Sequence, residues 1–364
     1  MKILVITCGH GPTDDRIYFK EIQSLLTHGH DVVLLTMNRG NTDTIRKRFR
    51  HIDCQCTRLK QYKNFAENFA YNWKPDRVII HEFELLPCGV KIKAGLKIPL
   101  IFDVHEAHRE MWSAFSTKPP GIKQIINWSL GAFERFHIKH VDCVLVPSPI
   151  LIDRYSNSGI ATYFVPNYPR LISFNDGIAT EKQRIIYHGQ ISYERGIGDL
   201  IEAVKNLPQY HDTLNVDIYG SERLSNTITR MMCQIKKLGL GKIISIHDSL
   251  LYDDILVELF RADIGIVPFH DLPMFQIAVP IKLFEYMMCN CVVVTSDLPL
   301  IREFIGDIAH YYSPGDIEGL QNILITVLEN IKDLKKRAIA GRKLIEKKYN
   351  WGKIESMFID AVIG

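Results

Sequence analysis

Short apolar runs alternate with amphipathic stretches through almost the whole chain, and this alternation restricts the fold more than any other feature. In the first half the apolar runs are Ile3–Thr7, Asp31–Thr36, Arg77–Ile80, Pro99–Asp103 and Cys143–Pro147. Each run has the length of a buried strand, and the stretches between them are long enough for crossover helices. The pattern predicts an α/β protein with parallel sheets that are covered by helices on both faces.

The alternation is interrupted once, in the segment "YFVPNYPRLISFNDGIATEKQ" at residues 163–183. Its prolines, asparagines and glycine are typical of a linker or an exposed loop. A length of 364 residues also favours two domains. We therefore predict two facing Rossmann-like domains, 1–167 and 168–345, with a cleft between them that is the default binding site. Residues 346–364 are expected to form a helix that packs back toward the first domain.

Composition excludes several classes of protein. The formal net charge is only +3, so nothing requires a nucleic-acid partner. The 8 cysteines are scattered, and Cys54 and Cys56 form a lone CxC, which favours reduced thiols in a cytoplasmic protein over a disulfide framework or a zinc site. The opening "MKILVIT" is too short for a signal peptide and is interpreted as a strand. No apolar run reaches the ~18–20 residues of a membrane span.

A glycine turn follows the first predicted strand, in "GHGPTDDR". Gly9 and Gly11 permit a tight turn whose amides, together with the next helix N-terminus, could meet an anion or a sugar. The dinucleotide fingerprint GxGxxG is incomplete, because its third glycine is replaced by Asp14. The alternative is a turn that serves only to join strand and helix.

A histidine lies just beyond another predicted strand, in "IFDVHEAHREMW". Asp103, His105 and Glu106 would stand where open α/β sheets bind their ligands. His105 and His108 are three positions apart, which does not fit the HExxH zinc motif. The alternative is a solvated loop histidine.

The second half contains two further candidate stretches. In "YHGQISYERGIGDLIEAV", Gly189 allows close approach of the backbone, and Arg195 precedes a helix N-terminus that favours anions. An arginine suits a diphosphate, although a surface arginine near Glu194 is the alternative. In "MFQIAVPIKLFEYMM", Pro280 is placed in a first helical turn, with Lys282 and Glu285 behind it. Those two would line the nucleotide side of the cleft or form an ordinary solvated salt bridge.

Together these stretches resemble the retaining glycosyltransferases of family four, which have the GT-B fold. The resemblance extends over essentially the whole chain. It is carried by "GHGPTDDRIYFKEIQSLLTHGHDVVLLT", "FDVHE", "VPN" at the hinge, "HGQISYERGIGDLIEA" and "PIKLFEYMMCNCVVVTSDLP".

The resemblance implies functional roles for particular residues, and the chain departs from the family's pattern at some positions. Its implied catalytic residues are His105, Arg195 and Glu285, and its implied donor-binding residues are Gly11, Gly189, Gln190, Gln276, Ile277 and Lys282. Gln190 stands where the family usually has arginine, and Arg195 where lysine is usual. The first of the family's paired glutamates would fall at Ile277, beside Gln276. Half of the expected diphosphate clamp is therefore missing or supplied by another residue.

The sequence thus predicts an enzyme that transfers a hexose, with retention, from a nucleotide diphosphate sugar to a glycan or lipid-linked acceptor in surface polysaccharide or glycoconjugate synthesis. No cofactor is expected, and no metal, because no acidic pair of the DxD type stands at a strand end. Two alternatives stay open. One is another GT-B enzyme, a nucleotide-sugar epimerase or a phosphorylase. The other is a nucleotide-sugar-binding protein with weakened chemistry.

Two segments predict peripheral attachment to an anionic membrane surface, on its inner face. "MWSAFSTKPPGIKQIINWSLGAFERF" interleaves aromatic, aliphatic and basic residues, as interfacial segments do. Residues 45–64 concentrate basic side chains, among them Arg46, Lys47 and Arg48. The alternative is a buried helix with a basic rim.

Overall fold

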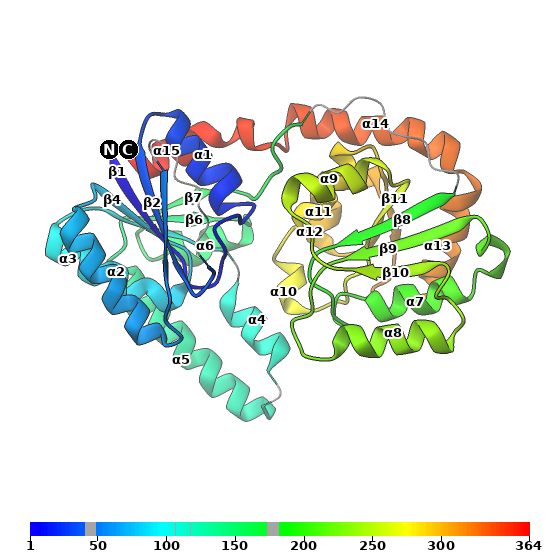
Figure 1. The fold of residues 1–364 in the computed structure, drawn as a ribbon, viewed down its shortest axis with the longest axis horizontal. Coiled ribbons are helices and arrows are strands. Elements are labelled where there is room, and N and C mark those ends of the chain that lie inside the picture. Colours follow the sequence, from blue (N-terminus) through cyan, green and yellow to red (C-terminus); the bar gives the residue numbers. More distant parts are fainter. Residues whose placement is uncertain (41–48, 106, 117, 173–181) are drawn as a thin grey trace. The chain divides into compact units, whose positions relative to one another are not determined.

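The structure is a computed structural model that describes residues 1–40, 49–105, 107–116, 118–172 and 182–364. It divides the chain into two compact α/β units (Figure 1). The first comprises Met1–Asn167 and Trp351–Gly364, and the second comprises Tyr168–Asn350. The predicted Glu106 and the basic residues Arg46, Lys47 and Arg48 lie outside the described residues.

The sheet of the first unit is parallel, and its described strands are ordered β3-β2-β1-β4-β5-β6-β7. The strands are β1 (Lys2–Ile6), β2 (Asp31–Met37), β3 (Phe49–Cys54), β4 (Arg77–Ile80), β5 (Leu100–Asp103), β6 (Cys143–Val146) and β7 (Ala161–Phe164). The central strands bury nearly every residue, which explains their continuous apolar runs. Sequence patterns missed β3 and β7 because these edge strands are only partly buried and carry polar residues.

Helices cover this sheet, and the last of them holds the C-terminal end of the chain against this unit. They are η1 (Ile17–Ile22), α1 (Gln23–Thr27), α2 (Leu59–Trp73), η2 (Phe83–Leu85), α3 (Leu86–Leu96), α4 (His108–Phe115), α5 (Pro120–Ile138), α6 (Ile150–Ser156), η5 (Trp351–Lys353) and α15 (Glu355–Ile363). The last helix returns to the unit that holds the N-terminus (Figure 1). Trp351 is buried and donates from Nε1 to Ser24 Oγ at 2.8 Å. Arg77 donates to the backbone carbonyls of Val362 and Ile363.

The second unit repeats this architecture, with described strands in the order β10-β9-β8-β11-β12-β13. These strands are β8 (Gln183–His188), β9 (Leu214–Tyr219), β10 (Ile244–His247), β11 (Ile264–Val267), β12 (Val292–Ser296) and β13 (His310–Tyr312). Its helices are α7 (Ile197–Lys205), η3 (Pro208–Tyr210), α8 (Thr227–Lys237), α9 (Tyr252–Phe260), α10 (Pro273–Gln276), α11 (Ile281–Met288), α12 (Pro299–Ile305), η4 (Gly306–Ile308), α13 (Ile317–Glu329) and α14 (Ile331–Lys347).

Each sheet has a point at which the strand order reverses. In the first unit β1 pairs with β2 on one side and β4 on the other, and in the second unit β8 pairs with β9 and β11. Chains leave such a pair of strands in opposite directions, so the loops at the carboxyl ends separate and leave room for a ligand. Gly11, Gly189 and Arg195 stand on loops at these two places, whereas His105 follows β5, and Lys282 and Glu285 belong to α11.

Among the described residues, no helix combines the length and the apolar character that a membrane span needs.

Candidate functional site

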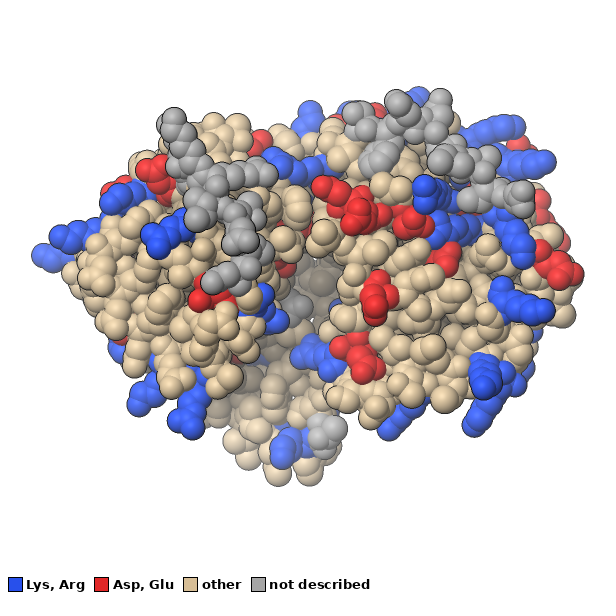
Figure 2. Space-filling view, viewed as in Figure 1, with Lys and Arg blue, Asp and Glu red and all other residues tan. Residues whose placement is uncertain are grey.

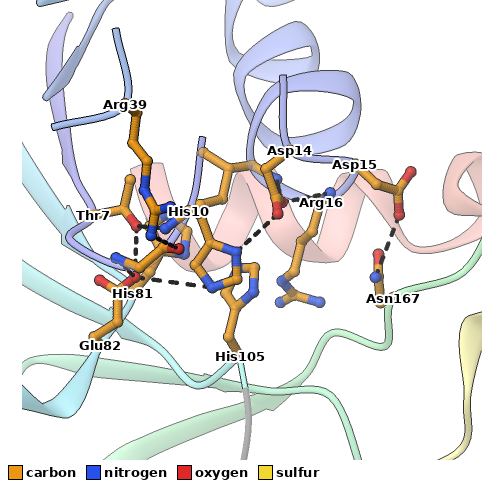
Figure 3. A network of polar contacts seen from close by, with 12 residues as sticks. Thr7, His10, Asp14, Asp15, Arg16, Arg39, His81, Glu82, His105 and Asn167 are labelled. Carbon is orange, nitrogen blue, oxygen red and sulfur yellow. Dashed lines mark hydrogen bonds and ion pairs between the residues drawn. The ribbon is translucent and has the colours of Figure 1, made fainter. Parts of the chain in front are cut away.

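In the first unit, Glu82 organises the glycine turn that follows β1 (Figure 3). Its carboxylate accepts from Thr7 Oγ1 at 2.6 Å, from the Cys8 amide at 3.0 Å and from the Gly9 amide at 2.8 Å. A Cβ at Gly9 would stand only 2.8 Å from Glu82 Oε1, so glycine is needed for this approach. These amides are therefore occupied by the protein's own carboxylate. The expectation that the glycine-turn amides are available to an outside anion is wrong for Gly9.

Arg16 is the centre of a buried ion cluster beneath this turn. Its guanidinium donates to both carboxylate oxygens of Asp103, at 2.8 and 2.6 Å, and lies 2.8 Å from Glu21 Oε1. Burial opposes ionisation of both carboxyls. For Asp103 the Arg16 charge outweighs burial and holds the pKa well below its ordinary value. Burial and the Asp103 charge instead raise the pKa of Glu21 well above its ordinary value. Arg16 thus lies between two carboxyl groups whose pKa values are shifted in opposite directions.

His105 lies beside this cluster, and its side chain is only 9% exposed. Its ring centroid is 4.2 Å from that of His10 and 4.9 Å from that of His81 (Figure 3). Burial, followed by the charges of His10 and His81, lowers its pKa well below the ordinary value. His105 is therefore a neutral imidazole that can hydrogen-bond an uncharged hydroxyl. The alternative of a solvated loop histidine does not fit this burial.

Asp14 orients His10 at the opening of the turn. His10 Nδ1 lies 2.8 Å from Asp14 Oδ2, and Asp14 also accepts from the Arg16 and Ile17 amides. Gly11 is the first residue of the turn that leads to Asp14, whose amide donates to the Gly11 carbonyl. Burial resists ionisation of Asp14, but its bond to His10 prevails and lowers its pKa. Asp14 stands where the dinucleotide fingerprint requires its third glycine. Its role here is to hold His10 and the backbone of the turn in place.

Two groups of side chains in this unit have the spacing of metal ligands. The first is Glu21, His81, Asp103 and His105, and the second is His10, Asp14 and His105. In the first group Arg16 already holds both oxygens of Asp103, so a cation is present there. The second is partly exposed, and imidazole with carboxylate suits a divalent transition metal. Its Asp14 oxygens are already used by His10 and by backbone amides.

In the second unit, two glycines shape the loop between β8 and α7. Gly189 has φ +112° and Gly196 has φ +69°, in the region that favours glycine. A Cβ at Gly196 would lie 1.7 Å from the Pro268 carbonyl oxygen, so this loop touches the end of β11 directly. The guanidinium of Arg195 consequently lies over two phenylalanine rings, 5.2 Å from the Phe269 centroid and 5.5 Å from that of Phe275.

Lys282 is buried in the same place, on α11. Its Nζ lies 3.9 Å from the ring centroid of Tyr187 and 5.3 Å from that of Phe269. Within the described residues, Nζ has no hydrogen-bond partner. A Cβ at Gly189 would lie 3.0 Å from Nζ, so the glycine leaves room for the ammonium group. Burial, followed by the charge of Arg195, lowers the pKa of Lys282 well below its ordinary value.

Arg195 and Lys282 therefore share one aromatic floor, and the Arg195 charge disfavours the charged form of the buried Lys282. In the part of the chain that the structure describes, neither makes an ion pair with a carboxylate. A buried charge without a counter-ion is costly, and a second cation nearby adds to the cost. An anionic ligand bound between the two would remove this cost. The alternative of a solvated lysine–glutamate bridge is wrong, because Lys282 and Glu285 are both buried and Glu285 lies against His188.

Glu285 has a different partner from the one the sequence suggested. It is buried, and its Oε2 lies 3.1 Å from His188 Nε2 at the end of β8. Pro280 is the N-cap residue of α11 rather than a residue of its first turn. The helix nevertheless brings Lys282 and Glu285 to the same β8 end, next to Gly189.

The remaining predicted donor-binding residues divide into two groups. The Gln190 carbonyl accepts from Tyr187 Oη at 2.6 Å, so Gln190 lies next to the tyrosine that also contacts Lys282. Gln276 is exposed, and its amide donates to Asp271 Oδ1 at 2.6 Å. Ile277 is the C-cap of α10. The stretch "MFQ" belongs to α10, where the ring of Phe275 lies against the Arg195 guanidinium.

Sequence reasoning missed several residues that build these clusters. They are Arg16, Glu21, His81 and Glu82 in the first unit, and Tyr187, His188 and Phe269 in the second. Glu82, Tyr187, His188 and Phe269 stand at or just beyond strand ends, so attention to every strand end would have found them.

Comparison with solved structures defines the class of fold. Sucrose-phosphate synthase from Thermosynechococcus elongatus superposes with a TM-score of 0.79 at 14% identity, over 99% of this chain and 98% of that one. Anabaena Alr3699/HepE in complex with UDP and glucose gives 0.76 at 16% identity, over 100% and 99%. WaaG, a glycosyltransferase involved in lipopolysaccharide biosynthesis, gives 0.72 at 15% identity, over 100% of both chains. The fold is GT-B, which confirms the predicted fold class.

Sequence comparison points to the same class of protein. Residues 170–344 match the profile described as "Glycosyl transferases group 1", so the chain is similar to the group 1 glycosyltransferases over this segment. Glycogen synthase of Mycobacterium tuberculosis (strain H37Rv) is 20% identical over 294 residues, which cover 77% of this chain and 66% of that protein. The chain thus spans slightly less than two thirds of that relative's length.

Proposed function

We propose that the protein transfers a hexose, with retention, from a nucleotide diphosphate sugar to a glycan or lipid-linked acceptor in surface polysaccharide or glycoconjugate synthesis. The observation that carries the proposal is that Arg195 and the buried Lys282 share one aromatic floor, with no carboxylate in ion-pair contact among the described residues. A diphosphate supplies the missing negative charge, and the same cations stabilise it as it leaves the sugar. The match of residues 170–344 to the group 1 glycosyltransferase profile supports transferase chemistry.

Lys282 takes the part of the clamp that the resemblance assigns to an arginine at position 190. Its ammonium lies against Gly189, next to Gln190. Glu285, held by His188, would accept hydrogen bonds from the ribose. His105 would hold an uncharged sugar hydroxyl through its neutral imidazole. Gln276 and Ile277, through their backbone at the end of α10, would contact the donor sugar.

Charge neutralisation by these two side chains leaves no task for a divalent ion, so we propose that turnover needs neither metal nor resident cofactor. Activity that persists unchanged in a chelator supports this view. Restoration of a chelated enzyme by Mg²⁺ or Mn²⁺ contradicts it.

The donor is the first quantity to measure. UDP-glucose is a reasonable first ligand because Anabaena HepE has been solved in complex with it. A thermal-shift screen of UDP-, GDP- and ADP-sugars should give one base a clear rise in melting temperature, since a ligand that binds only the folded state stabilises it. Arg195→Ala should abolish that rise, whereas Arg50→Ala, at an exposed site in the first unit, should keep it. No shift with any nucleotide sugar would defeat the proposal.

Product analysis then separates transfer from the alternatives. Transfer requires an acceptor fraction and releases nucleoside diphosphate. An epimerase would convert donor alone into an isomeric sugar, and a phosphorylase would depend on inorganic phosphate. A binding protein with weakened chemistry would give the thermal shift without product in any acceptor fraction.

A further inference from the structure

Helix α5 leaves large apolar side chains uncovered along one side. Ile122 is 46% exposed, Ile125 66%, Trp128 67% and Phe136 60%. With about 100° of rotation per residue, these four positions fall within one third of the helix circumference. The helix buries Gly131, Glu134 and Ile138 on its opposite side. A continuous exposed stripe of this kind is a contact surface, because isolated surface residues would not share one face.

Basic residues border this stripe. Lys118 and Arg135 are exposed, and the exposed Lys139 holds its Nζ 4.9 Å from the ring centroid of Phe136. The single acidic residue between Pro120 and Ile138 is Glu134, which is buried and accepts from Tyr155 Oη at 2.5 Å. In Figure 2 the tip of α5, at the bottom of the view, is tan with blue beside it. The exposed charge of this face is therefore positive.

We propose that the exposed face of α5 lies on an anionic lipid bilayer, with Ile125, Trp128 and Phe136 in the interface and Arg135 and Lys139 at the headgroups. A tryptophan and aliphatic side chains on one side of a helix gain free energy at the level of the headgroups. Each basic residue near an anionic surface adds about 1 kcal/mol. A protein partner would need an apolar patch with exposed acidic residues around it. An anionic bilayer offers both an apolar interior for the stripe and negative headgroups for the basic residues.

This inference deepens the proposed function, and rests on it only in one respect: a lipid-linked acceptor would be met at this surface. Binding to the bilayer itself does not depend on the donor. The two can therefore fail separately, and one set of variants distinguishes them.

The test is sedimentation of the full chain with phosphatidylcholine vesicles and with vesicles that also contain phosphatidylglycerol. The wild type should sediment with the anionic vesicles only. Ile125→Ser with Trp128→Ser should lower the partition coefficient by at least about tenfold, because roughly 0.8 kcal/mol is lost for each methylene group withdrawn from the interface. Arg135→Gln with Lys139→Gln should lower it by about tenfold or more on anionic vesicles.

The matched control removes equally exposed apolar residues from the second unit. Met232 is 55% exposed and Leu251 63%, and Met232→Ser with Leu251→Ser should leave vesicle binding unchanged. Arg195→Ala should lose the nucleotide-sugar thermal shift and keep vesicle binding, and the α5 variants should do the reverse. Absence of wild-type binding, or equal loss in the control, overturns the proposal. So does a dimer in sedimentation velocity that Trp128→Ser dissolves, since a second copy would then cover the face.

Discussion

The loops at the two switch points start from the same kind of strand end, but the two units treat buried charge differently. In the first unit Arg16 is matched by Asp103 and Glu21, and Asp15 by Lys20. In the second unit Arg195 and Lys282 rest on aromatic rings, with no carboxylate in ion-pair contact among the described residues. Among the described residues, the first arrangement pairs its cations with carboxylates and the second does not.

The two arrangements are chemically suited to different kinds of ligand. A neutralised site that presents a neutral imidazole is suited to hydroxyl groups, because it attracts no ion strongly. A site in which an arginine and a lysine lie together without an ion-pair carboxylate among the described residues is suited to a diphosphate. It also stores a free-energy cost in the unliganded protein, as functional sites often do. The same change, from a buried cation to methionine, should therefore have opposite signs in the two units.

Arg16→Met tests the first unit, in which the buried cation is paired with carboxylates. It should have the largest effect on stability. Loss of one member of a buried ion cluster leaves Asp103 unpaired and should lower the free energy of unfolding by about 3–5 kcal/mol. The four tryptophans, Trp73, Trp112, Trp128 and Trp351, all belong to the first unit. Tryptophan fluorescence in urea therefore reports this unit alone. Arg50→Met, at an exposed position, should change the value by less than about 0.5 kcal/mol. A similar small change for Arg16→Met would show that the cluster contributes little.

Arg195→Ala tests the second unit through its effect on the rate of turnover. Removal of one preorganised donor to the leaving diphosphate should lower kcat by about 10²–10³-fold, or ~3–4 kcal/mol. Arg195→Lys should recover most of the rate, since the resemblance places lysine at this position. Steady-state kinetics with the donor found by thermal shift gives both values. An alanine variant with the wild-type kcat contradicts the role of Arg195.

His108→Gln tests whether the first unit depends on neutral imidazoles. Burial is the main cause that lowers the pKa of His108 to about 4 from its ordinary 6.5. Between these values the unfolded chain takes up a proton that the folded chain resists, so acidification through this window favours unfolding. The wild type should lose up to about 1.4 kcal/mol per pH unit from this group, and the variant should lack that contribution. Urea titrations followed by tryptophan fluorescence at several pH values measure it. Parallel pH curves for the two proteins would rule out a buried neutral His108.

Lys282→Met should have the smallest effect on stability and the most informative sign. Replacement of an unpartnered buried ammonium by an apolar chain of similar length should raise the stability of the second unit by roughly 1 kcal/mol. Hydrogen exchange of peptides from α11 measures this change. Donor affinity should fall about tenfold at the same time, because one of two charge contacts to the diphosphate is lost.

A second substitution sharpens that result. Gln190→Arg in the Lys282→Met background should restore donor affinity if Lys282 replaces the family's arginine. Calorimetric titration with the nucleotide diphosphate decides between restoration and no change. A destabilised Lys282→Met protein would mean that the lysine is matched after all, and the contrast between the units would disappear.

Much of the fold could be predicted from the chain because parallel strands buried on both faces need continuous apolar runs. β1, β4 and β5 all appear in that way, and so do the loops that follow them. The edge strands β3 and β7 could not be recognised, since a half-exposed strand carries polar residues that resemble a loop. Among the candidate site residues, Gly189, Arg195, Lys282 and Glu285 were recognisable from motifs, and they gather at the end of β8.

The sequence could not predict which charged side chains contact one another, because these contacts depend on which strand ends become neighbours. Glu82 reaches the turn after β1 only because β4 pairs with β1. Glu285 meets His188 rather than Lys282 because α11 turns its buried side to the end of β8. The sequence by itself determined where the strands end and which chemical groups follow them, since both are written in local patterns. Only the tertiary structure decided which of those groups are neutralised, because neutralisation needs side chains brought together from distant parts of the chain.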